Sequence, residues 1–172
     1  GAELLNGART NTNAAWIGQN VMSVGGVIDW HMTVNDEKNT IESALDEVPT
    51  SIDVVLCTGG LGPTHDDITS SVLYDYFGAK PEFDEKYWQL LTKKFAARDQ
   101  VIPDINRNQA MKPDIGEVIP NPIGSARGLH LSNKSYHLFA MPGVPAEMKS
   151  MMTDTILPWI ESRSKSKIHV TV

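Results

Sequence analysis

Apolar residues along the 172-residue chain recur with two spacings, which predict helices and strands that alternate. The 3.6-residue spacing predicts helices over 12–24, 41–48, 68–77, 84–98 and from 146 onwards, with a short one at 104–111. Short apolar or alternating runs predict strands at 27–34, 53–58, 117–119, 136–141 and 168–172. Pro158 is expected to kink or end the last helix. Such alternation indicates an α/β fold, with helices on both faces of a mostly parallel sheet.

A glycine-rich turn, TGGLGPTHDD at 58–67, follows the apolar run at 53–57 and precedes a predicted helix. Its glycines, Gly59, Gly60 and Gly62, allow a sharp turn and a close approach of backbone N–H groups to a ligand. The start of the following helix directs its positive dipole end toward the same place. The turn is therefore expected to bind the phosphate of a small ligand.

Two adjacent carboxylates, Asp66 and Asp67, lie beside this turn and would repel a bare phosphate. A divalent cation resolves the conflict, and so does a hydroxyl-rich ligand that bridges phosphate and carboxylate. Aspartate is also an ordinary N-cap residue, and Thr64 is a further cap candidate. Because one helix has one N-cap residue, at least one aspartate is left for a ligand or a metal ion.

Three turns are expected to meet at one edge of the sheet, at 34–36, 58–67 and 141–145, because ligands bind at the carboxyl ends of parallel strands. Asp36 lies in the first turn, where it is also a candidate N-cap. Pro142 and Gly143 lie in the third and precede a helix start, a second possible anion site.

Several amides are also candidates for ligand binding. Asn11 and Asn13 start the first helix, where asparagine either caps the helix or bonds to a ligand. Asn108 and Gln109 either read the edge of a base or stabilise their short helix.

Composition and charge narrow the classes of function. Fifteen basic and twenty-one acidic residues give a net charge of −6 without a basic stripe, which argues against a nucleic-acid groove. The single Cys57 cannot form an internal disulfide, so a reducing, cytoplasmic location is expected. No apolar run has membrane-spanning length and no signal peptide precedes Gly1, so no membrane partner is expected. The length suits one domain over 1–162, followed by a linker or the start of an absent second domain at 163–172.

Seven motifs occur in a characteristic order along nearly the whole chain. They are GAELLNG at 1–7, NTN at 11–13, VND at 34–36, TGGLGPTHDDIT at 58–69, NQAMKP at 108–113, NPIG at 121–124 and MPGVPAEM at 141–148. In these motifs the chain resembles the CinA-type competence/damage-inducible proteins, in the domain that they share with molybdenum-cofactor biosynthesis proteins. The resemblance implies a three-layer α/β/α domain that binds a pterin or nucleotide phosphate at the glycine turn. We also expect a homo-oligomer.

The resemblance also implies roles for individual residues. Asp36 and Asp67 match the acidic residues that serve the reaction in the molybdenum-cofactor relatives, and Asp67 with Asp66 would hold a divalent metal ion. The implied activity is hydrolysis of ADP-ribose with Mg²⁺, Mn²⁺ or Co²⁺, with K⁺ as a further candidate ion. Glu3 would accept hydrogen bonds from ribose hydroxyls, or is only a solvated carboxylate. The alternatives are a module that binds molybdopterin or a nucleotide without hydrolysis, and a domain for oligomerisation or regulation.

Three positions depart from the family pattern. Ala2 replaces the aspartate of a G-D-E motif, which places activity in doubt if that aspartate holds a metal ion or substrate. Arg127 stands where the family favours proline, and it either adds a phosphate contact or is an exposed substitution without a role. Val144 replaces a polar residue of the cofactor relatives, which argues against a pterin function.

Overall fold

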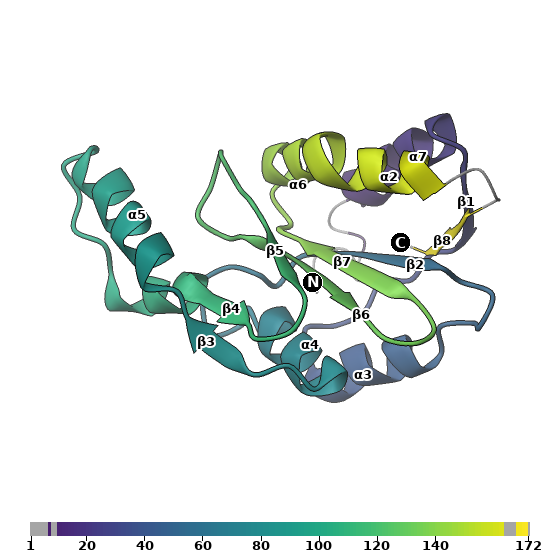
Figure 1. Ribbon diagram of the computed structural model, residues 1–172, viewed down its shortest axis with the longest axis horizontal. Coiled ribbons are helices and arrows are strands. Elements are labelled where there is room, and N and C mark those ends of the chain that lie inside the picture. Colours follow the sequence, from purple (N-terminus) through teal and green to yellow (C-terminus); the bar gives the residue numbers. More distant parts are fainter. Residues whose placement is uncertain (1–6, 8–9, 164–167, 172) are drawn as a thin grey trace.

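The computed structural model describes residues 7, 10–163 and 168–171. In this part of the chain the main sheet has six strands in the order β1-β8-β2-β7-β6-β5 (Figure 1). Its strands are β1 (Gly26–Trp30), β2 (Val54–Thr58), β5 (Glu117–Ile119), β6 (Gly128–Ser132), β7 (His137–Met141) and β8 (Ile168–Thr171). Parallel pairing joins β1, β8, β2 and β7, whereas β6 runs antiparallel to both β7 and β5. The predicted mostly parallel sheet is confirmed.

Helices cover both faces of the sheet and complete three layers (Figure 1). One face carries α2 (Thr12–Ser23), α6 (Pro145–Met151), the π-helix η2 (Met152–Ile156) and α7 (Leu157–Arg163), and the other carries α3 (Lys38–Asp46) and α4 (Thr69–Phe77). Side chains along β2 alternate between the two faces of the sheet. Val54 and Leu56 pack into the core against α2 and α6, and Val55 packs into the core against α3 and α4. None of the helices in the described ranges is long and apolar enough to cross a membrane.

The last helical run continues past Pro158 and reaches Arg163. The expectation that Pro158 ends this helix is therefore wrong. A π-turn directly precedes the proline, and in it the N–H of Leu157 bonds to the carbonyl of Met152, five residues back. Proline lacks an N–H and its ring crowds the carbonyl four residues earlier. The wider turn provides the room that the ring needs.

Residues 81–113 form an arm that projects from the main sheet (Figure 1). Its elements are β3 (Pro81–Phe83), α5 (Glu85–Ala96), the 3₁₀-helix η1 (Asp104–Ala110) and β4 (Met111–Pro113). The two helices follow the sequence prediction, whereas the antiparallel pair of β3 and β4 does not. Strands of three residues with proline at one end are too short to show a period of two.

Residues 168–171, expected in a linker or at the start of another domain, form a strand inside the main sheet. This strand, β8, pairs in parallel with β1 through Gly26 and with β2 through Val54. The hydroxyl of Thr171 also donates to the carbonyl of Trp30 at 2.8 Å. The segment therefore belongs to the same sheet as the strands on either side of it.

Candidate functional site

The glycine turn after β2 has a backbone conformation that only glycine adopts easily. Gly59 and Gly60 have φ angles of +108° and +66°. The N–H of Gly59 donates to the carbonyl of Met141 at 2.9 Å, which continues the pairing of β2 with β7. A Cβ on Gly60 would overlap the hydroxyl of Thr69 and lie 2.9 Å from its Cβ. The turn is therefore packed directly against the start of α4.

A second turn, after β7, lies against the first. A Cβ on Gly143 would be 3.4 Å from the Cα of Gly59, and Pro142 is buried beside it. The side-chain amide of Asn13 in α2 donates to the carbonyl of Gly143 at 2.9 Å. The Oδ1 of Asn13 is buried without a hydrogen-bond partner. Asn13 thus ties α2 to this turn, and its buried Oδ1 is left without a partner.

Asp67 is held in a turn of its own. Its Oδ2 accepts from the N–H and from the hydroxyl of Thr64, at 3.0 and 2.6 Å. A Cβ on Gly62 would lie 2.8 Å from Cγ of Asp67, so the carboxylate covers this glycine. Helix α4 begins later, at Thr69, with Ile68 in the N-cap position. The expectation that Thr64 or one of the aspartates caps this helix is wrong, because a separate turn precedes it.

Asp36 follows β1 and is exposed. It is not the N-cap of α3, which begins at Lys38 and has Glu37 in the cap position without a side-chain bond. Asp36 instead lines a pocket of about 150 Å³ together with Gly59. Burial raises the pKa of Cys57 in this pocket to about 11, and the charge of Asp36 adds to the effect. The three turns therefore meet as expected, while the ligand roles of their residues stay predictions.

The pocket is lined mainly by apolar side chains, with a few polar groups among them. Its apolar walls include Ile41, Leu45, Val48, Val55 and Leu73, and its polar groups include Asn11, His31, Thr58 and Thr69. Apolar walls with a few polar groups are typical of sites for small organic ligands. Asn11 also caps α2, because its Oδ1 accepts from the N–H of Ala14 at 3.0 Å.

The donor groups near the glycine turn fit a hard cation shared with a phosphate. Among residues 7, 10–163 and 168–171, no three His, Cys, Asp or Glu side chains gather in a group that could hold a metal ion. Mg²⁺ at phosphate sites commonly takes one or two carboxylates and completes its shell with phosphate oxygens and water. Asp66 is exposed and Asp67 is partly exposed, so neither carboxylate is closed off from solvent ions.

Two amides of the arm brace the glycine turn. The side chain of Gln109, which is buried, donates to the carbonyl of Leu61 at 2.9 Å. Asn108 donates to the carbonyl of Pro63 at 3.5 Å. These contacts stabilise the turn after β2 and not the short helix of the two amides, and the role of the amides in reading a base stays a prediction.

Asn121 is a buried residue that sequence reasoning did not single out. Its Oδ1 accepts from the N–H groups of Ile123 and Gly124 at 3.1 and 2.8 Å, and its amide donates to Glu147 at 2.6 Å. The carboxylate of Glu147 therefore anchors a turn as well as lying in the first turn of α6. The Asn-Pro-x-Gly pattern at 121–124 is a turn signal that could have revealed Asn121.

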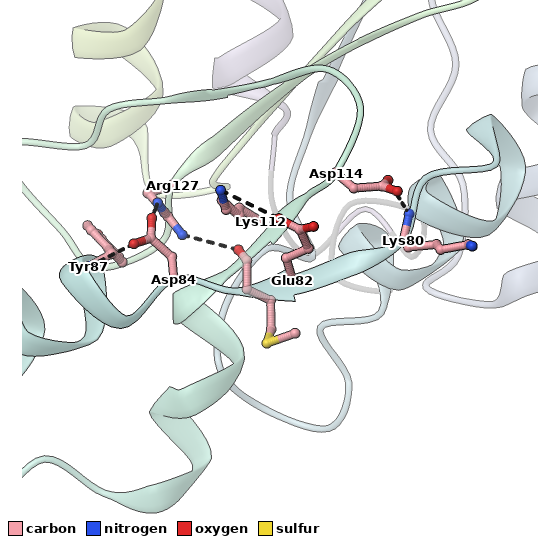
Figure 2. A network of polar contacts seen from close by, with 8 residues as sticks. Lys80, Glu82, Asp84, Tyr87, Lys112, Asp114 and Arg127 are labelled. Carbon is pink, nitrogen blue, oxygen red and sulfur yellow. Dashed lines mark hydrogen bonds and ion pairs between the residues drawn. The ribbon is translucent and has the colours of Figure 1, made fainter.

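Arg127 is not an exposed substitution without a role, so that expectation is wrong, and a phosphate contact stays a prediction. Its side chain is 8% exposed, and its Nη1 donates to Asp84 at 2.7 Å. Its Nη2 donates to the carbonyl of Met111 at 3.2 Å, and the guanidinium lies 3.9 Å from the ring centre of Tyr87 (Figure 2). Ala2 and Glu3, which the sequence also singled out, lie outside the described residues.

The site lies in a domain of known type. A family model described as "Probable molybdopterin binding domain" matches residues 1–162, so the chain belongs to this family. A putative competence-damage inducible protein of Caldicellulosiruptor saccharolyticus is 36% identical over 172 residues, which are 100% of this chain and 42% of that protein. The chain thus spans less than half the length of this curated relative.

Two solved structures are similar to this chain. The protein CinA from Thermoplasma acidophilum, described as having unknown function, superposes with a TM-score of 0.80 at 31% identity, covering 93% of each chain. A molybdopterin biosynthesis protein from Mycobacterium abscessus superposes with a TM-score of 0.60 over 94% of this chain and 87% of that chain. At 16% identity the second similarity supports the fold alone.

Proposed function

We propose that this domain hydrolyses a nucleotide diphosphate of the ADP-ribose type, with a divalent metal ion, to AMP and ribose phosphate. The observation that carries the proposal is the contact between the two glycine turns beside a held carboxylate. Gly59 and Gly143 carry no side chains where the two turns touch, so a phosphate can approach the backbone there, and Asp67 is fixed against Gly62 of the same turn by Thr64. A diphosphate beside a carboxylate needs a cation, which explains why both features occur together.

Each group of residues at the site would have a separate role in the hydrolysis. The turn at 58–62 would hold the diphosphate through its backbone, as glycine-rich turns do. Asp67 and Asp66 would hold the cation, which when bound supplies positive charge against the diphosphate and makes water a better nucleophile. Asp36, which lines the pocket together with Gly59, would orient the attacking water. Addition of that water breaks one bridging P–O bond and leaves two phosphate monoesters.

The apolar pocket would receive the part of the ligand that carries no phosphate. Its walls suit an aromatic base, and polar groups that line it, among them His31 and Thr58, would bond to a hydroxyl or amine of the ligand. An aromatic base and a ribose together supply both kinds of surface, which supports a nucleotide over inorganic pyrophosphate.

One observation favours the alternative, a domain that binds a nucleotide or molybdopterin without hydrolysis. Described residues provide no group of three metal-ligating side chains, and Oδ2 of Asp67 already accepts two hydrogen bonds. Under this alternative the aspartates would bond to ligand hydroxyl groups. Binding would then occur equally well with and without a divalent metal.

The decisive experiment follows AMP release from ADP-ribose with Mg²⁺, Mn²⁺ or Co²⁺, each with and without K⁺, and with EDTA as the control. The parent chain and the Ala2→Asp variant, which restores the usual family residue, are compared. Metal-dependent AMP release from either one supports hydrolysis. Ligand binding without cleavage of any nucleotide diphosphate in both chains contradicts it and supports the binding alternative.

A further inference from the structure

A pair of histidines lies at the end of the sheet opposite the glycine turn. His137 is the first residue of β7, and the turn with Gly143 follows the last residue of the same strand. At 3.3 Å per residue the pair is roughly 13 Å along the strand from that turn. His130 lies on the neighbouring strand β6, where it pairs with Phe139 in the antiparallel register.

The two imidazoles present ring nitrogens to one another. Nε2 of His130 and Nδ1 of His137 are 3.0 Å apart. The ring of His130 stacks on Phe139 with centroids 4.2 Å apart, and Trp159 of α7 packs edge-on against His137 at 4.8 Å. These aromatic contacts hold both rings in orientation, which is the first requirement of a ligand pair.

A carboxylate lies behind the first imidazole. Oε2 of Glu117 on β5 is 3.5 Å from Nδ1 of His130, the nitrogen that faces away from His137. A carboxylate at this position keeps the ring proton on Nδ1 and leaves a lone pair on Nε2. Histidines that bind metal ions commonly have such a partner. Burial also lowers the pKa of both imidazoles, which favours the neutral form that binds metal ions.

We propose that His130 and His137 together bind one divalent transition-metal ion of the Zn²⁺ class, with water as the remaining ligands. Two nitrogens on a tetrahedral Zn²⁺ are about 3.3 Å apart, so the rings need to separate by only a few tenths of an ångström. Without the ion the 3.0 Å spacing is that of a hydrogen bond from Nδ1 of His137 to Nε2 of His130, so binding moves the proton of His137 to Nε2 and both facing nitrogens then offer lone pairs. Imidazole favours Zn²⁺, Cu²⁺ and Ni²⁺, whereas carboxylates favour Mg²⁺. The site is therefore separate from the proposed hydrolytic one.

One nearby charge opposes the ion. The guanidinium of Arg163 lies 3.8 Å from the ring centre of Trp159, next to the pair, and its positive charge acts on both histidines. Described residues offer no third ligand of the His, Cys, Asp or Glu type. Binding is consequently expected to be weaker than at a structural zinc site with four protein ligands.

The test is calorimetric titration of the whole chain with ZnCl₂ at pH 7.5, together with the absorption spectrum of bound Co²⁺. The parent should bind one ion in this site and melt at a higher temperature with Zn²⁺ than without it. His130→Gln and His137→Asn each keep an amide near the lost ligand nitrogen, and each should bind more than about 10-fold more weakly. Glu117→Gln should lower the affinity for Zn²⁺ about 10-fold, and Arg163→Gln should raise it.

A control variant separates this site from others. His65→Gln removes an exposed loop histidine, so it should bind Zn²⁺ as the parent does. Unchanged Zn²⁺ affinity in both histidine-pair variants overturns the proposal, and so does a parent that binds no Zn²⁺. Should one of the pair variants fail to fold by circular dichroism, the other and Arg163→Gln decide. Neither result depends on any hydrolytic activity.

Discussion

Arg127 and Asp84 form an ion pair that ties the projecting arm to the main sheet. Nη1 of Arg127 and Oδ2 of Asp84 are 2.7 Å apart, with side chains that are 8% and 22% exposed (Figure 2). The other oxygen of Asp84 accepts from the N–H of Tyr87 at 3.0 Å and thereby caps α5. One carboxylate therefore both starts the helix of the arm and attaches it to the turn before β6.

Replacement of the arginine by lysine should destabilise the protein. Arg127→Lys keeps the charge but loses the planar fork, the bond to the Met111 carbonyl and the stacking on Tyr87. Hydrogen bonds to charged groups contribute about 1.5–3 kcal/mol, and the free energy of unfolding in urea should fall by about this much. The control is Lys112→Gln, which removes an exposed pair with Glu82 and should cost less than about 1 kcal/mol. Equal losses in the two variants would contradict a special role for Arg127.

The ion pair of Arg127 and Asp84 also predicts how the stability of the protein depends on pH. Burial alone raises the pKa of Asp84, but hydrogen bonds from Arg127 and from the N–H of Tyr87 outweigh it and lower the pKa overall. The ionised carboxylate therefore adds stability that is fully present above its unfolded pKa of roughly 3.9 and is lost as pH falls through the lower folded pKa. Urea unfolding of the parent and Asp84→Asn should show a constant gap from neutral pH down to about pH 5. The gap should shrink below about pH 4, and a gap of full size at pH 3 would refute the assignment.

The sequence predicted the elements in which the apolar pattern extends over several residues. It also predicted that three of the turns between them meet. The strand before the glycine turn and helix α4 after it follow the prediction closely because β2 is buried on both faces and Gly78 ends the helix. The convergence of the turns follows from parallel pairing of β2 with β7, which brings their carboxyl ends together.

The remaining features depend on contacts between residues far apart in the sequence. No local pattern links Arg127 to Asp84, 43 residues earlier, so the sequence did not indicate their ion pair. The aspartates looked like helix caps because a turn that closes on itself between Thr64 and Asp67 has the same composition as a helix start. The strand β8 is four residues long, and its sequence does not indicate which sheet it joins.

The contact between the glycine turns offers a test that leaves the fold intact. A methyl group at Gly143 would meet the Cα of Gly59 at 3.4 Å, an ordinary contact, so Gly143→Ala should change the free energy of unfolding by no more than about 0.5 kcal/mol. The methyl group would, however, occupy the space between the turns, and binding of ADP-ribose should weaken at least 10-fold, roughly 1.4 kcal/mol. Calorimetric titration with ADP-ribose measures this loss.

A comparison variant at the neighbouring glycine shows why Gly143 is the better choice. Gly60→Ala combines a φ of +66° with an overlap on Thr69, so it should lower stability as well as affinity. Loss of binding in Gly60→Ala alone, with unchanged affinity in Gly143→Ala, would mean that the phosphate does not lie between the two turns.

Asp67 allows the hydrolytic and structural roles of the site to be separated. Asp67→Asn keeps an oxygen that can accept from the N–H and hydroxyl of Thr64, so stability should change by less than about 1 kcal/mol. It removes the charge that would hold the cation, and metal-dependent cleavage of ADP-ribose should fall by at least about 100-fold. Thr64→Val removes only the hydroxyl, leaves the charge and should reduce activity less.

The matched control is Asp99→Asn, a change at an exposed residue of the arm with φ of +54°, which asparagine tolerates. Full turnover in a folded Asp67→Asn variant would exclude this carboxylate as a metal ligand, and it would move the cation to Asp66 or Asp36.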